Sequence, residues 1–274
     1  MAKISNEDRH QYYEKIKPYK ATIQDLLKRE EMVLQIIKKD SRGAAFKRLT
    51  LAEEMVSLAS HYIIISGVSL SMLKLRNEEA LNDGRKSLYK AVIYLEEVVT
   101  PLVDAPYSDY EEKLAEIAPI DAMRRYTLIK KVGLGIELLE KAYGDNTKWR
   151  WAFVELEGRY AAVAKNIMDL KTAVANTDPS SPDYEPTVYH LRLLKKLLLQ
   201  AADRYREKYE LSTNRIDDFR MGIHFLNALK RIHILMGDRN DVETVKKKAE
   251  IWSAKLEVDI KRQEEEAVKR LSNG

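Results

Sequence analysis

Apolar residues recur at every third or fourth position along most of the chain, and this is the spacing of one face of an α-helix. Clear stripes lie within residues 78–100 and 187–211, and another, from Val242 to Leu256, keeps a heptad register. The first stripe consists of Leu88, Ala91, Val92, Leu95 and Val98. No segment resembles a strand with its own turns. The pattern predicts an all-α protein of about seven or eight long antiparallel helices, packed as one bundle or two sub-bundles.

Polar residues, prolines and glycines at the ends of these stripes predict where helices begin and end. Ser5 and Asp8 have the spacing of a capping box, in which two side chains satisfy the first free amides of a helix. Gly237 suits the position just after a helix. Pro18 interrupts the first stripe, so we expect one helix to end near residue 17 and another to begin at residue 19.

Two proline-rich segments divide the helical stripes. Residues 101–120 contain three prolines, and the segment TDPSSPDYEP at residues 177–186 contains three more. The first predicts a boundary between an N-terminal part, residues 1–104, and a C-terminal part, residues 105–274, unless the chain turns a corner there within one continuous domain. The second predicts an exposed loop that proteases can reach.

A run of nineteen uncharged residues, MVSLASHYIIISGVSLSML, separates Glu54 from Lys74. As a helix it would be about 28 Å long, close to the thickness of a bilayer core. Its five serines, and the charged sequence at both ends, favour a helix buried inside the bundle instead of a membrane span. On that interpretation a neighbouring backbone approaches one face closely. The small residues of that face are Ser57, Ser60, Gly67 and Ser71.

Composition and charge indicate the compartment and the class of partner. Of the 274 residues 33% are charged, and the net charge is only +4 with both signs interspersed, which is not the strong basic excess of a dedicated nucleic-acid binder. Residues 186–274 hold 19 basic and 14 acidic side chains, against 28 and 29 in the rest. The chain has no cysteine, and its polar N-terminus lacks the apolar core of a signal peptide. These features predict a cytoplasmic protein.

Candidate catalytic and metal-binding residues are scarce. A carboxylate-bridged two-metal bundle needs two Glu-x-x-His pairs, and the chain has one, Glu7 and His10, in a polar segment. His224 and His233 are nine residues apart and lie on opposite sides of one helix, so they cannot chelate together. His61 is expected to be buried and bonded to a neighbouring serine or carbonyl. We therefore expect no catalytic residue, no metal site and no cofactor.

Two groups of side chains are candidates for binding a partner. Arg192, Lys195 and Lys196 lie on one helical face and can present a basic patch to an acidic partner, although a solvated face has the same pattern. Trp149 and Trp151 begin a helix on different faces. One of them is therefore expected to point outward as an aromatic anchor, unless it covers the end of the core.

The leading hypothesis is a non-enzymatic helical scaffold or adaptor that acts through protein–protein interaction, with self-association left open. Heptad-like stripes, fifteen tyrosines and dense mixed surface charge support it. The second hypothesis is binding of nucleic acid or another polyanion through the mildly basic residues 186–274. An enzyme with an unfamiliar helical site is the third.

Overall fold

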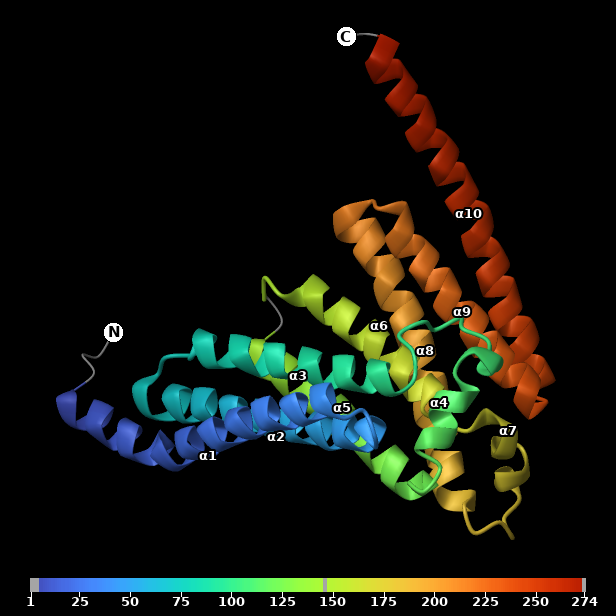
Figure 1. Cartoon of the computed structure of the whole chain (residues 1–274). Coiled ribbons are helices and arrows are strands. Elements are labelled where there is room, and N and C mark those ends of the chain that lie inside the picture. The colour runs from blue at the N-terminus through green and yellow to red at the C-terminus, as the bar shows by residue number, and fades with distance from the viewer. Residues whose placement is uncertain (1–4, 145–146, 273–274) are drawn as a thin grey trace. The chain divides into compact units, whose positions relative to one another are not determined.

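The computed structural model describes residues 5–144 and 147–272 (Figure 1). In this part of the chain there are ten α-helices, eight of them with seven or more residues, and no strand. The prediction of an all-α bundle is confirmed. The α-helices are α1 (Asn6–Lys39), α2 (Ala44–Leu73), α3 (Glu78–Val98), α4 (Glu111–Glu116), α5 (Ala122–Tyr143), α6 (Arg150–Asn166), α7 (Leu170–Ala173), α8 (Tyr184–Lys208), α9 (Ile216–Met236) and α10 (Arg239–Ser272). Shorter turns of other helix types are η1 (Tyr107–Asp109), η2 (Ala175–Thr177) and η3 (Tyr209–Thr213).

The chain folds into two compact units. Unit 1 contains residues 1–101 and 108–156, and unit 2 contains residues 102–107 and 157–274. Helix α6 contributes its residues through Leu156 to unit 1 and the remainder to unit 2. The expected boundary at residues 104 and 105 stays a prediction, because compactness alone does not show which segments fold on their own.

Helix α2 organises unit 1 and packs against α1, α3 and α5. The predicted stripe of α3 is buried, since each of its five side chains is at most 2% exposed. Gly84 of α3 brings this helix close to α2. A Cβ at this position would lie 3.5 Å from the carbonyl oxygen of Ala59 and 3.4 Å from the Cβ of Tyr62. The close approach predicted for the small residues of α2 is therefore made through a glycine of α3.

The uncharged segment of α2 is buried only in part, which corrects the prediction that it lies inside the bundle. Ser57, Gly67 and Ser71 are exposed, and Ser60 is half-buried. These residues are therefore not the side of α2 that packs on α3, because Gly84 of α3 lies against Ala59 and Tyr62. By length and composition α2 is the one helix among the described residues that could cross a membrane, and one third of its most apolar 18-residue window is buried in the protein.

Pro18 lies inside α1, and the predicted break at this residue is wrong. The capping box at Ser5 and Asp8 is confirmed, with the Asp8 amide donating to Ser5 Oγ at 3.0 Å. The helix continues past Pro18 because the proline lies on an exposed face. Proline has no backbone N–H, so the carbonyl group one turn earlier loses its hydrogen-bond donor. On an exposed face, water can take the place of that donor.

The apolar spacing of residues 147–176 predicts one continuous helix, but α6 ends ten residues early, at Asn166. Asp169 then begins α7 by accepting a hydrogen bond from the Lys171 amide at 3.0 Å. The Asn166 side chain donates to the carbonyl oxygen of Leu102 at 3.0 Å and fixes the segment 102–107 against the end of α6. The apolar spacing alone did not reveal this break.

Helix α9 is the centre of unit 2, where it packs against both α8 and α10 (Figure 1). The heptad register predicted for the last helix is confirmed for four apolar residues, which are buried: Val245, Ala249, Trp252 and Leu256. Asp259 occupies the next position of the register and is only 3% exposed. It accepts a hydrogen bond from the hydroxyl group of Tyr209 at 2.8 Å and one from the Lys255 ammonium group at 2.8 Å. The last position of the register is therefore a buried carboxylate, and the ammonium group of Lys255 balances its charge.

Candidate functional site

The predicted basic patch lies on α8, and its three members differ in their surroundings. Arg192 and Lys196 are exposed, whereas Lys195 is half-buried. The ammonium group of Lys195 pairs with the carboxylate of Asp238, which follows α9 in the chain. One of the three predicted charges is thus neutralised by an acidic neighbour.

Arg192 and Lys195 also line a shallow hollow of about 290 Å³ in unit 2. Its wall combines apolar side chains of α8 and α9 with charged groups of both signs. The lining residues include Val188, Leu191, Arg192, Lys195, Met236 and Asp238. Two members of the predicted basic patch, Arg192 and Lys195, therefore line a concave surface that also includes an acidic residue, Asp238.

The turn between α9 and α10 determines where the acidic residue lies. Gly237 has a φ of +75°, a conformation that favours glycine. Its amide donates to the carbonyl oxygen of Ile234 at 3.1 Å, and the Asp238 amide donates to that of His233 at 3.0 Å. This pair of bonds is the Schellman pattern that ends many helices. The tight turn brings Asp238, and Asp241 in the first turn of α10, back toward His233.

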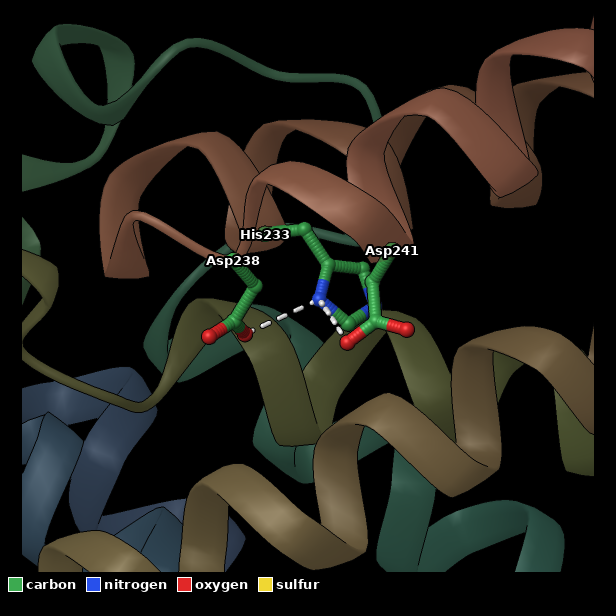
Figure 2. A group of neighbouring side chains, drawn as sticks. All are labelled: His233, Asp238 and Asp241. Carbon is green, nitrogen blue, oxygen red and sulfur yellow. Dashed lines mark hydrogen bonds and ion pairs between the residues drawn. The ribbon is translucent and has the colours of Figure 1, made fainter.

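His233, Asp238 and Asp241 form a compact cluster at the edge of this hollow (Figure 2). The Nδ1 atom of His233 lies 3.0 Å from Oδ2 of Asp238 and 3.7 Å from Oδ2 of Asp241. Among the described residues, these three form the group of side chains that could hold a metal ion. The hydrogen bond from Lys195, helped by His233, lowers the pKa of Asp238 below its usual range, although partial burial acts in the opposite direction.

Sequence analysis identified Lys195 but missed this cluster. The Glu-x-x-His spacing places ligands within one helix, whereas these three residues span a helix end, a glycine turn and a new helix. The signal present in the sequence is a histidine in the last turn before Gly237, followed by aspartates five and eight residues after the histidine. This spacing alone does not show that the three side chains are close together, because their proximity depends on the turn at Gly237.

The two candidate tryptophan anchors lie in unit 1, and both are half-buried. The Arg85 guanidinium group lies 4.1 Å from the centre of the Trp149 ring, and that of Arg150 lies 4.8 Å from the centre of the Trp151 ring. Each indole ring therefore has an intramolecular cation against it. A role for either ring as an anchor for a partner stays a prediction.

Three other histidines make contacts with carbonyl or carboxylate oxygens. His61 is half-buried, not buried as expected, but its Nδ1 does lie 2.7 Å from the carbonyl oxygen of Ser57. The Nδ1 atom of His224 lies 3.1 Å from Oδ2 of Asp104. His224 and His233 therefore have different carboxylate partners. His190 is buried, and its Nε2 lies 2.8 Å from the carbonyl oxygen of Ala164. These contacts are consistent with roles in holding segments of each unit together.

Comparison with known proteins assigns the chain to a family. No curated protein and no solved structure matches it. A family model does match, and it covers residues 8–260, which include all of α2 through α9 and the cluster at the beginning of α10. Since the match extends over more than half of the sequence, the chain belongs to the TP0443 family.

Proposed function

We propose that this chain is a non-enzymatic helical scaffold that binds another protein through one exposed face of α2. The α2 face consists of Ser57, Ser60, Ile64, Gly67 and Ser71. The observation that carries the proposal is that this face is uncharged and mostly exposed, in a chain of which 33% of the residues are charged. We take five uncharged positions on one side of a helix, in a chain this rich in charge, as the mark of an interaction site.

The spacing of the α2 face suits a second helix. Its members are separated by three, four, three and four residues, so they lie along one side of α2. Ile64 is 41% exposed at the centre of the face. A Cβ at Gly67 would have no heavy atom within 4 Å, so the surface there is open.

The chemistry of the face selects the kind of helix that would bind. Small side chains allow the backbone of a partner helix to approach, as Gly84 already allows between α3 and the opposite side of α2. A charge on the partner would be desolvated against this surface without a counter-charge, which is unfavourable. We therefore propose that the partner presents a helix with an uncharged face of small and apolar residues.

Polyanion binding through residues 186–274 has less support. Four of its lysines are held in ion pairs within unit 2, which are Lys195 with Asp238, Lys208 with Asp218, Lys248 with Asp203 and Lys255 with Asp259. A site that captures phosphates through lysines would keep those lysines available. The absence of a salt-dependent shift with DNA or RNA at low salt would remove this alternative.

The experiment tests the α2 face with a matched pair of charge substitutions in the full chain. Ile64→Lys places a charge at the centre of the face, and Ile36→Lys makes the same change on α1, where the side chain is 50% exposed. Each variant is expressed in the native host, and the amount of co-purified partner is measured relative to the chain. We expect at least about a tenfold loss of partner for Ile64→Lys and little change for Ile36→Lys, because only the first buries a charge in the interface.

Three outcomes would overturn the proposal. One is recovery of the unaltered chain alone and monomeric under native conditions. Another is equal partner recovery with both variants. The third is recovery with lipid in the membrane fraction instead of with a protein, since a bilayer would be an alternative environment for the same face. The cytoplasmic location that we propose would fail with the third outcome.

A further inference from the structure

We infer that His233, Asp238 and Asp241 form a binding site for one divalent transition-metal ion, and that zinc fits it best. This inference is independent of the α2 face, which lies in unit 1. The three side chains contribute one imidazole nitrogen and two carboxylate oxygens, all within 4.8 Å of one another. Figure 2 shows the Nδ1 atom of His233 directed toward both carboxylates.

The two distances from His233 are close to those between ligands of a tetrahedral zinc ion. Two ligands bound at about 2.05 Å in tetrahedral geometry lie about 3.3 Å apart. The observed Nδ1–Oδ2 distances of 3.0 Å to Asp238 and 3.7 Å to Asp241 lie on either side of this value. A bound ion would draw the two carboxylates, which lie within 4.8 Å of His233 and of each other, to this separation.

The site is partly preorganised and has a route of entry. The His233 side chain is only 9% exposed, and the hydrogen bonds of the glycine turn place the Asp238 backbone. The Asp241 side chain is 64% exposed, so an ion can reach the cluster from solvent. Three protein ligands leave a fourth position for water or for an anionic group that enters the hollow lined by Asp238.

Lys195 places a positive charge beside the cluster. Its ammonium group contacts the same Oδ2 atom of Asp238 that faces His233. A bound divalent ion would displace this ammonium group, which could then turn toward the hollow. Removal of the lysine charge would leave two carboxylates without that competing cation, so the affinity for the ion would rise.

The donor set distinguishes among metal ions. Calcium and magnesium prefer six or more oxygen ligands, and this site offers a nitrogen and only two carboxylates. Imidazole together with carboxylate suits zinc and the neighbouring transition metals. Cobalt(II) can therefore replace zinc as a probe whose visible absorption reports the coordination geometry.

The test uses the full chain after treatment with a chelator and dialysis. Zinc chloride is titrated by calorimetry and cobalt chloride by visible absorption, with the unaltered chain and three variants. Asp241→Asn removes a ligand at an exposed position, Lys195→Gln removes the competing cation, and Asp217→Asn is a matched control at an aspartate whose side chain is 76% exposed. Circular dichroism of each variant verifies that it remains helical.

We expect one zinc ion per chain. Loss of an outer-shell partner alone commonly weakens metal affinity about 10–100-fold, so the loss of a ligand in Asp241→Asn should cost at least about tenfold. Lys195→Gln should bind zinc several-fold more tightly, and Asp217→Asn should match the unaltered chain. Equal affinities for Asp241→Asn and Asp217→Asn would place the metal elsewhere and overturn the inference. So would the absence of zinc binding, or a cobalt spectrum that the Asp241 substitution leaves unchanged.

Discussion

At the residue scale, two buried charged side chains, Glu30 and Lys165, are held mainly by partners far away in sequence. Glu30 of α1 is 3% exposed and accepts hydrogen bonds from Tyr94 and from Lys90 at 2.8 Å. Lys165 of α6 is also 3% exposed, and its ammonium group donates to the carbonyl oxygen of Ala105 at 3.2 Å and to Oδ1 of Asn166 at 2.9 Å. Neither group could be predicted from the sequence, because most of their partners are about sixty residues distant.

Lys165 gives unit 2 a specific dependence on pH. Burial, and then the charge of Arg231, lower the pKa of Lys165 to about 8, against an opposing effect of Asp104. The unfolded chain therefore binds more protons than the folded chain between pH 8 and about 10.5, so this lysine makes the protein more stable as the pH rises through that window. Urea unfolding at pH 7 and pH 10 should show that the stability of the unaltered chain, relative to Lys165→Met, rises by on the order of 2–3 kcal/mol. A difference independent of pH would contradict the cause we assign.

At the element scale, the sequence predicted the helices better than their surroundings. The capping box at Ser5 and the glycine turn at Gly237 were recognisable because they depend on local backbone hydrogen bonds. Pro18 was misjudged because its effect depends on exposure, which spacing does not give. The burial of α2 was overestimated for a related reason. Lack of charge shows that a helix could be buried, but only its neighbours decide which face is covered.

Close contacts between helices make one glycine sensitive to substitution. A Cβ at Gly158 of α6 would lie 2.5 Å from Cε2 of Tyr205 in α8. That ring is 6% exposed and stacks on Phe225 with ring centres 5.6 Å apart, so it has little room to move. We expect Gly158→Ala to lower the free energy of unfolding by about 1–3 kcal/mol in urea denaturation.

The matched control is the same substitution on the α2 face. Gly67 also lies within a helix, and a Cβ there would meet no heavy atom within 4 Å. Because alanine favours helix more than glycine does, Gly67→Ala should raise the stability by up to about 1 kcal/mol. Equal effects of the two substitutions would show that α6 and α8 do not pack as closely as described.

At the scale of the whole molecule, the candidate sites arise from turns and packing that one sequence does not reveal. Lys195 and Arg192 could be chosen from spacing alone, but the hollow they line requires α8 and α9 to be placed side by side. The cluster at His233 requires the turn after α9, and the α2 face became a candidate only when its exposure was known. The sequence thus predicted the fold class and several helix ends, and it could not predict which surfaces remain uncovered.

Unit 2 should survive a cut in its exposed loop. Residues 178–180 are exposed between η2 and α8, as the proline-rich sequence predicted. The helices on either side of the loop are held together within unit 2, where Arg204 lies 3.2 Å from Glu157 in addition to the contact of Gly158 with Tyr205. Limited proteolysis should therefore cut near residue 180 and give two fragments that co-elute in size-exclusion chromatography. Fragments that separate without denaturant would contradict this packing.

The central claim, that the α2 face binds a helix of another protein, is tested most directly by photo-crosslinking in the native host. A photoreactive residue replaces Gly67 in the full chain, and the matched control carries it at Ile36 of α1. Mass spectrometry then identifies the adducts. The account predicts that position 67, but not position 36, forms adducts with one other protein, within a helix that has an uncharged face. Adducts with lipid alone, adducts only between copies of this chain, or equal labelling at both positions would contradict it.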